Sequence, residues 1–447
     1  MKPGIPKGTR DFTPTQVYRR QYILQIIQSI FEKYGYQPIE TPAMEKLETL
    51  TGKYGDEGDQ LIFKVLNNGD YLRKADPEAL SEKDSQKLIP SIARRGLRYD
   101  LTVPFARFVT MHQHELQFPF KRYQMQPVWR ADRPQKGRYQ EFYQCDADAI
   151  GTDSLICEAE YIRIIDQVFD QLGIKVSIFL NNRKVLAGIA ELLGAPDRLA
   201  ELTVTIDKLD KIGREAVDID LLNKGFDNDQ ISKLHDFLDL EELSELSRAL
   251  ATSIIGSTGV SELSEVLSYL EGMELNNHLR IKTSLARGLN YYTGCIFEVT
   301  AHAHEMGSLL GGGRYDDLTG VFGLKGVSGV GISFGVERIY DICEAANLFP
   351  DVLDKRIKAL FLGLDKESHR AAFALAERCR IAGIACDVYP DPAKLRKQMK
   401  FANQIGVRYT IVLGSEELQS RRYTCKDMDS GDQELLDLDQ LIQKLAR

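Results

Sequence analysis

The sequence lacks any cysteine pattern that would indicate disulfides or a structural metal. Its 447 residues include seven cysteines, which are scattered, odd in number and never spaced C-x-x-C. Such a pattern is typical of reduced thiols in a cytosolic protein and gives no zinc-binding spacing. We therefore expect a cytoplasmic protein that holds no metal through its own side chains.

Long apolar runs are also missing. The opening residues, MKPGIPKGTRDF, contain no apolar core of a secretion signal, and no later apolar run approaches the length needed to cross a membrane. Charged residues make up 27% of the chain and hydrophobic residues 43%, which is ordinary for a globular protein. These properties predict a soluble protein with no membrane partner.

A surplus of positive charge is absent as well. The formal net charge is -8 at pH 7. We therefore do not expect the whole surface to coat nucleic acid, although local basic sites are compatible with an acidic body. At this length the chain should form two or three domains with ample cores.

The most informative stretch present is residues 120–151, FKRYQMQPVWRADRPQKGRYQEFYQCDADAIG. It predicts two β-strands around a short polar loop. Along the second strand, alternation places on one face Gln140, Phe142, Gln144, Asp146 and Asp148. This face combines an aromatic ring, amides and carboxylates, so it could line a polar cavity.

The loop between these two strands is strongly basic. Residues 121–139 carry six basic side chains against the single acid Asp132. A cationic loop beside a strand with hydrogen-bond acceptors suits a ligand that is anionic at one end and hydrogen-bonding at the other. From this stretch alone, a solvated hairpin with a charged tip is an equally good interpretation.

A second candidate site lies at residues 98–104, RYDLTVP, which predict a short strand leading into a helix near Pro104. Asp100 and Thr102 would share one face of that strand. A carboxylate and a hydroxyl together could hold an ammonium group, and capping of the helix is the alternative role.

Two glycine-rich segments come later. Residues 311–316, GGGRYD, predict a tight turn where a backbone or ligand comes close. Residues 326–338 predict a strand whose glycines leave room for a flat ligand to lie on it. The helix that follows, starting near Gly335, would present Arg338 in its first turn, where backbone amides and a guanidinium favour an anion.

The remaining sequence suggests further modules. Residues 191–275 hold nineteen acids against seven bases, with helical apolar spacing, and predict an inserted helical module. From residue 357, strands alternate with helices, which predicts a small parallel α/β domain. Residues 394–426 carry eight bases against two acids, which indicates nucleic-acid binding, with a solvated face as the alternative.

Taken together, these motifs resemble the class II aminoacyl-tRNA synthetases, and specifically the histidyl-tRNA synthetase family. The resemblance covers essentially the whole chain. It rests on the segments RYDLTVPFARF (98–108), WRADRPQKGRYQEFYQCD (129–146), RGLNYYTG (287–294), GGGRYD (311–316) and GVGISFGVERI (329–339). The RGLNYY segment is the family-specific one.

The resemblance implies an α+β catalytic domain with a mixed, mainly antiparallel sheet flanked by helices, a helical insertion and a C-terminal anticodon-binding α/β domain. The implied boundaries are 1–182 and 276–345 for the catalytic domain, 183–275 for the insertion, 346–356 for a linker and 357–447 for the anticodon-binding domain. It also implies a homodimer, with the segment around Pro42 at the interface.

The implied reaction has two steps. The carboxylate of L-histidine attacks the α-phosphate of ATP, assisted by Mg²⁺, and gives histidyl-adenylate and pyrophosphate. The histidyl group then passes to the 3′-terminal ribose of tRNA(His).

Motif positions imply roles for individual residues. Arg130 would bridge the α-phosphate and the histidine carboxylate, and Arg287 would supply a second positive charge at the α-phosphate. The other implied ATP contacts are Asp132, Arg138, Phe142 beneath the adenine and Arg338 at the γ-phosphate. Gln135 would approach the tRNA acceptor end.

The implied histidine site has two ends. Asp100, Leu101 and Thr102, helped by Gln144, would bind the ammonium. Asp148 and Tyr292, with Tyr291 beside them, would read the imidazole.

Two positions depart from the family pattern. Asn290 stands where aspartate is usual, and Asp132 stands where glutamate is common. We expect both to be tolerated, because the surrounding arginines and tyrosines are intact. The alternative function is that of a non-catalytic paralogue acting as a regulatory subunit. Such a protein would be expected to lack the RGL-x-YY arginine or the C-terminal domain, and both are present.

Overall fold

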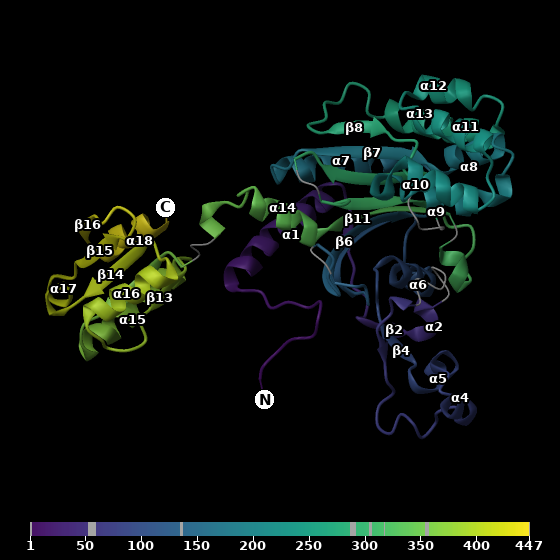
Figure 1. Cartoon of the computed structure of the whole chain (residues 1–447). Coiled ribbons are helices and arrows are strands. Elements are labelled where there is room, and N and C mark those ends of the chain that lie inside the picture. The colour runs from purple at the N-terminus through teal and green to yellow at the C-terminus, as the bar shows by residue number, and fades with distance from the viewer. Residues whose placement is uncertain are drawn as a thin grey trace. The chain divides into compact units, whose positions relative to one another are not determined.

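The computed structural model describes residues 2–51, 60–134, 137–286, 292–303, 306–316, 318–353 and 357–446 (Figure 1). The residues up to Phe12 together with Arg20–Leu348 form one compact unit, and Thr13–Arg19 with Phe349–Arg447 form a second. Among the described residues, no helix is both long enough and apolar enough to cross a membrane.

The α-helices and β-strands up to residue 348 are, in chain order, α1 (Pro14–Lys33), β1 (Gln37–Pro38), β2 (Met44–Lys46), α2 (Leu47–Leu50), β3 (Lys64–Val65), α4 (Pro77–Glu82), α5 (Ser85–Ile92), β4 (Arg95–Leu97), α6 (Thr102–His112), β5 (Phe120–Trp129), β6 (Glu141–Ile150), α7 (Ile156–Gln171), β7 (Val176–Asn182), α8 (Arg183–Leu192), α9 (Leu199–Ile206), α10 (Leu209–Asn223), α11 (Asn228–Leu238), α12 (Leu243–Ala249), α13 (Ile254–Ser268), β8 (His278–Ile281), β9 (Cys295–Ala301), β10 (Leu310–Tyr315), β11 (Gly329–Gly335) and α14 (Val336–Ala345).

The first unit is built on an eight-stranded sheet in the order β1-β5-β6-β11-β10-β9-β7-β8. Its neighbouring strands are antiparallel except at the two edges, where β1 pairs with β5 and β7 with β8 in parallel. The predicted mixed, mainly antiparallel sheet flanked by helices is therefore confirmed.

Aromatic side chains pack helices against the sheet. The Phe31 ring of α1 lies 5.8 Å from the Tyr123 ring of β5 and 5.9 Å from the Phe334 ring of β11. From α7, the hydroxyl of Tyr161 donates a hydrogen bond to the Val330 carbonyl at 2.9 Å. These contacts hold α1 and α7 against β5 and β11.

The segment between β7 and β8 is helical, as its apolar spacing predicts, and Figure 1 shows α8 to α13 gathered together beside β7. Two glycines let α8 and α13 approach closely, because a Cβ at Gly188 would lie 2.5 Å from the Gly256 Cα. These helices belong to the same compact unit as the sheet. The predicted domain boundaries remain predictions.

The second unit contains β12 (Ala359–Gly363), α15 (Lys366–Ile381), β13 (Cys386–Val388), α16 (Leu395–Ile405), β14 (Tyr409–Leu413), α17 (Ser415–Ser420), β15 (Tyr423–Asp427), β16 (Gln433–Leu436) and α18 (Leu438–Ala446). Its sheet has the order β13-β12-β14-β15-β16. The first three strands are parallel, but β15 and β16 are antiparallel. The parallel α/β arrangement predicted from residue 357 is therefore confirmed for β12, β13 and β14. Strands β15 and β16 were not predicted; the connection of a few residues between them permits only an antiparallel hairpin.

All seven cysteines are free thiols, and all except the half-buried Cys386 are buried. Burial raises the pKa of these thiols; for Cys157 and Cys379 the pKa rises to about 11.

Candidate active site

A cavity of about 310 Å³ opens over β6, β10 and β11 in the first unit. Ten of the residues predicted to bind substrates line it: Asp100, Thr102, Arg130, Asp132, Arg138, Phe142, Gln144, Asp148, Tyr292 and Arg338. Leu101 is fully buried and does not line the cavity. Gln135, Arg287 and Tyr291, and the departure at Asn290, lie outside the described residues.

Strand β6 supplies the floor of the cavity through the alternation that its sequence predicts. Phe142, Gln144, Asp146 and Asp148 all face the cavity. The intervening side chains point to the other face, where Cys145 is fully buried. A single strand thus carries an aromatic ring, an amide and two carboxylates in one line.

Glycines on the neighbouring strands make room for these side chains. Gly331 of β11 lies opposite Asp148 in the sheet, and a Cβ on Gly331 would lie 2.1 Å from the Asp148 Oδ1. On β10, a Cβ on Gly313 would lie 2.7 Å from the Tyr292 ring. The GGGRYD segment is therefore a strand, and the predicted tight turn there is wrong. The close approach that the prediction inferred is present, but to neighbouring strands.

The segment before α6 also differs from the prediction. Strand β4 ends at Leu97, so Asp100 and Thr102 do not share a strand face; Thr102 instead begins α6. The Asp100 Oδ1 accepts a hydrogen bond from the Val103 amide at 3.3 Å, which is a capping contact. Both side chains nevertheless line the cavity, so the capping and ligand-binding interpretations are compatible.

One end of the cavity is acidic. Asp148 pairs with Arg122 at 2.7 Å and accepts a hydrogen bond from the Tyr315 hydroxyl at 2.6 Å. Burial raises the pKa of Asp148, and the Arg122 charge and the Tyr315 hydrogen bond oppose this rise. Beside it, burial raises the pKa of the Asp146 carboxyl to about 7, with Arg122 opposing and Asp148 adding to the shift.

The other end is cationic. Arg130 follows the last residue of β5; its Nε donates to the Tyr99 carbonyl at 2.8 Å, and its guanidinium carbon lies 5.1 Å from the centre of the Phe142 ring. Arg338 lies in the first turn of α14, as predicted, and donates to the carbonyls of Ser308 and Gly137. Backbone contacts thus fix the orientation of both guanidinium groups, and the start of α14 adds to a field that favours an anion.

Sequence reasoning missed several lining residues. Among them are Asp146, Tyr139, Tyr315 and Ser333. Asp146 was on the correct face of its strand and could have been proposed. The Ser333 hydroxyl accepts a hydrogen bond from the Gln144 amide at 2.9 Å, a contact that depends on the register between β6 and β11 and has no sequence signal.

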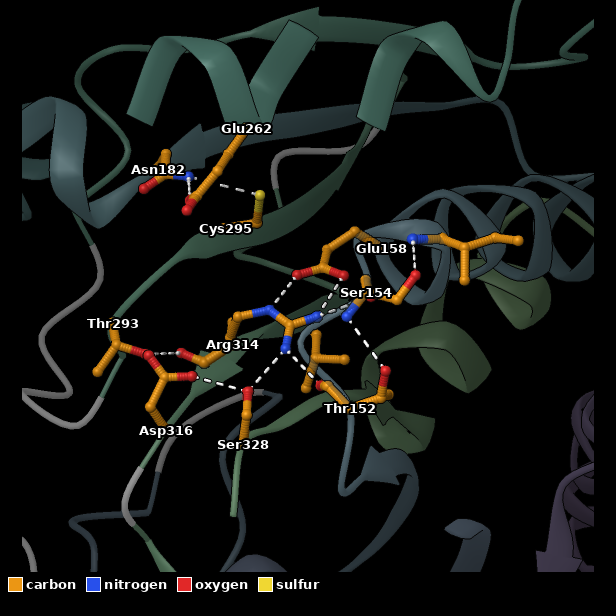
Figure 2. Close-up of polar contacts among 12 residues, drawn as sticks. Thr152, Ser154, Glu158, Asn182, Glu262, Thr293, Cys295, Arg314, Asp316 and Ser328 are labelled. Atoms are coloured by element: carbon orange, nitrogen blue, oxygen red, sulfur yellow. Dashed lines mark hydrogen bonds and ion pairs between the residues drawn. The ribbon is translucent and has the colours of Figure 1, made fainter. Parts of the chain in front are cut away.

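A buried ion pair joins α7 to β10, one of the strands that line the cavity (Figure 2). Arg314 of β10 donates to both carboxylate oxygens of Glu158 on α7, at 2.6 and 2.7 Å. Its guanidinium also reaches the Ser328 hydroxyl at 2.8 Å, and its carbonyl accepts a hydrogen bond from the Thr293 amide at 2.9 Å. Arg314 therefore ties α7, β10 and the residue after Tyr292 together.

Two family models match the chain. The model described as "Histidyl-tRNA synthetase" matches residues 8–73 and 70–339, and the model described as "Anticodon binding domain" matches residues 357–447. A histidine--tRNA ligase from Porphyromonas gingivalis is 51% identical over 443 residues, which cover 98% of each chain.

Solved structures give the same picture. The crystal structure of histidyl-tRNA synthetase from Nostoc sp. PCC 7120 is 30% identical, covers 100% of this chain and 99% of that chain, and aligns with a TM-score of 0.83. A Bacillus halodurans structure described as an "ATP phosphoribosyltransferase regulatory subunit/histidyl-tRNA synthetase" covers 90% of this chain and 97% of that chain, with a TM-score of 0.71 and 20% identity. The second likeness concerns the fold alone.

Proposed function

The chain belongs to the histidyl-tRNA synthetase family, and from that premise we propose how its cavity joins histidine to ATP. The protein ligates histidine to tRNA: it activates histidine with ATP to histidyl-adenylate and then transfers the histidyl group to tRNA(His). The alternative of a regulatory subunit has no observation in its favour.

The observation that carries the assignment of the site is the gathering of ten predicted residues around one cavity. In our proposal, ATP occupies the cationic end. Arg130 meets the α-phosphate and the substrate carboxylate, Arg338 meets the γ-phosphate, and Phe142 lies under the adenine. Arg138 and Asp132 complete the ATP contacts, and Arg287 adds a second charge at the α-phosphate.

Histidine occupies the acidic end in this proposal. Asp100, Thr102 and Gln144 hold the ammonium, and Asp148 with Tyr292 and Tyr291 reads the imidazole. A site built to hydrogen-bond two ring nitrogens rejects isosteres that lack them, because its buried polar groups would then lose their partners. Leu101 contributes through its backbone, and Gln135 contacts the acceptor end of tRNA.

The geometry suits phosphoryl chemistry. As the histidine carboxylate attacks, negative charge grows on the oxygens around the α-phosphorus, and guanidinium groups already oriented by backbone carbonyls stabilise that charge without reorganising. Arg130, anchored on the Tyr99 carbonyl, meets this requirement.

We propose that Mg²⁺ enters with ATP. Among the described residues, no cluster of three His, Cys, Asp or Glu side chains could hold a metal ion. The Glu337 carboxylate, which lines the cavity, is engaged by Arg10 and Arg20. Asp132 remains a suitable carboxylate, and Mg²⁺ is commonly held by one or two carboxylates together with substrate phosphates, whose charge it neutralises.

We also propose that the protein works as a cytoplasmic homodimer. The dimer proposal is supported by the family to which the chain belongs and by the segment around Pro42, whose prolines suit an edge or an interface. The location is supported by the scattered, unpaired cysteines.

The test of the proposed function is histidine-dependent exchange of pyrophosphate into ATP. The wild type should exchange, and Arg130→Ala should lower kcat by roughly 10²- to 10³-fold, by analogy with the loss of an oxyanion donor. Arg133→Ala is the matched control, because Arg133 is an exposed arginine of the same loop and does not line the cavity. Its exchange rate should equal that of the wild type.

Arg287→Ala should also be measured in this assay. An exchange rate equal to that of the wild type would contradict the role given to Arg287. Absence of exchange in the wild type would contradict the enzyme assignment. Equal rates in the wild type and Arg130→Ala would contradict only the role given to Arg130.

A further inference from the structure

A buried arginine lies directly beneath the proposed imidazole site. Arg122 of β5 is the cross-strand partner of Asp148 on β6, and it is 0% exposed. It does not line the cavity, so it cannot be one of the groups that meet a phosphate.

The Arg122 guanidinium reaches both ends of the histidine site. Its Nη2 pairs with the Asp148 Oδ2 at 2.7 Å and lies 3.5 Å from the carbonyl oxygen of Leu101, between Asp100 and Thr102. Its guanidinium carbon lies over the Phe105 ring, 4.2 Å from the ring centre.

The pair is not explained by stability. The Nε and Nη1 of Arg122 find no hydrogen-bond acceptor among the described residues. Buried polar groups without partners are costly, and a buried ion pair is often no more stable than apolar residues of similar volume. A function that needs the charge at this place would account for its presence.

Asp148 is held from several sides. The Tyr315 hydroxyl of β10 occupies its Oδ1, Arg122 occupies its Oδ2, and the absence of a side chain on Gly331 of β11 gives the carboxylate its space. Each carboxylate oxygen has a second lone pair that can accept a further hydrogen bond. The carboxylate is therefore fixed in one orientation while it keeps acceptor capacity toward the cavity.

We propose that Arg122 is a positioning residue for histidine recognition, which holds the Asp148 carboxylate and the Leu101 backbone in the arrangement that accepts the substrate imidazole and ammonium together. This inference rests on the proposed function of the cavity. Arg122 itself touches neither substrate; it acts through Asp148 and Leu101.

The electrostatics agree with this role. Burial raises the pKa of Asp148, and the Arg122 charge opposes that rise. The other titratable groups that interact electrostatically with Asp148 are Asp146 on the same strand, Tyr315 from β10, Tyr161 from α7 and Tyr36. Among these groups, Arg122 carries the positive charge, so its loss favours protonation of Asp148 and removes an acceptor for the imidazole N–H.

The experiment measures KM for histidine and for ATP separately by pyrophosphate exchange. Arg122→Met should raise the histidine KM by roughly 10- to 100-fold, the loss expected for a hydrogen bond to a charged group, with the ATP KM unchanged. The ratio of variant to wild-type histidine KM should fall as pH rises, because Asp148 regains its charge. Lys121→Met is the matched control: Lys121 is the adjacent residue on β5 and pairs with Glu160 at 2.5 Å on the other face. It should leave both KM values unchanged.

Arg122→Lys is the second variant, because lysine keeps a buried positive charge at this position but lacks the planar guanidinium group. It should raise the histidine KM by a smaller factor than Arg122→Met, and it carries the test alone if the methionine variant does not fold. A folded Arg122→Lys or Arg122→Met protein with the wild-type histidine KM would overturn the proposal, and so would equal increases in both KM values. A wild type without exchange would instead refute the proposed function.

Discussion

At the scale of single residues, burial sets the charge states in the cavity. Asp146 faces the cavity on β6, and burial raises the pKa of its carboxyl from 3.8 to about 7. An unfolded aspartate loses its proton near pH 3.8, whereas the folded one keeps it up to about pH 7. The folded state therefore binds more protons at this carboxyl in this window, so the contribution of Asp146 to stability should fall as pH rises from about 4 to about 7 and then level off.

We predict that Asp146→Asn removes this loss of stability at high pH. At pH 8 the variant should be more stable than the wild type by a few kcal/mol, at about 1.4 kcal/mol per pKa unit, and the difference should vanish near pH 4. Urea unfolding of the first unit at several pH values measures it. Asp153→Asn, an exposed carboxylate just after the same strand, should show the wild-type pH dependence. A constant difference between Asp146→Asn and wild type across this range would contradict the assignment.

At the scale of elements, the sequence was informative wherever a local pattern decides the structure. The alternation in β6 predicted which side chains share a face. The glycine-rich β11 followed by α14 predicted Arg338 in the first turn of that helix. GGGRYD was predicted to be a turn, because three glycines in a row are typical of one. In the fold, Gly312 is required because a Cβ there would lie 2.2 Å from the Gly331 carbonyl oxygen, a contact made by residues distant in sequence.

The strand predicted at residues 98–104 was wrong for a similar reason. Arg98 is buried, and its guanidinium donates to the carbonyls of Thr41 at 2.6 Å and Pro127 at 3.0 Å. Hydrogen-bond partners so distant in sequence leave no periodic pattern around Arg98 from which they could be predicted. The same holds for Arg122, whose importance depends on the register that places it opposite Asp148.

The ion pair between Arg314 on β10 and Glu158 on α7 gives a prediction at the scale of elements. Arg314→Met leaves the Glu158 carboxylate buried without its cation, which should cost about 3–5 kcal/mol of stability at neutral pH. Burial already raises the pKa of Glu158, and the loss of the Arg314 charge in the variant should raise that pKa further. The cost should therefore shrink as pH falls toward 4.5, where the unfolded carboxyl is protonated too. Thermal unfolding of the double variant Arg314→Met/Glu158→Gln should recover part of the loss at pH 7. No recovery would indicate that the other hydrogen bonds of Arg314 dominate.

At the scale of the whole molecule, charge is unevenly distributed. The chain carries a net charge of -8, yet α16 in the second unit presents Arg396, Lys397 and Lys400 as exposed side chains. A family model for anticodon binding matches this unit. A local basic helix on an acidic protein can bind the phosphates of tRNA without retaining nucleic acid in general.

We predict that replacing Arg396, Lys397 and Lys400 with glutamine weakens tRNA binding and makes the plot of log K against log salt less steep. The slope should fall by up to about 0.7–0.9 for each phosphate that the variant no longer neutralises. Pyrophosphate exchange should be unaffected, because these side chains belong to the other unit. Filter binding at several salt concentrations measures the slope. An unchanged slope would mean that α16 does not face the nucleic acid.

The burial of the cysteines has a practical consequence for studying this protein. Because six thiols are buried and Cys386 is half-buried, Cys386 should react with a maleimide dye ahead of the other six in the native state. If Cys386 is replaced, a single cysteine engineered on the surface would be the main site of labelling. Binding of tRNA could then be followed by fluorescence without changing the six buried cysteines.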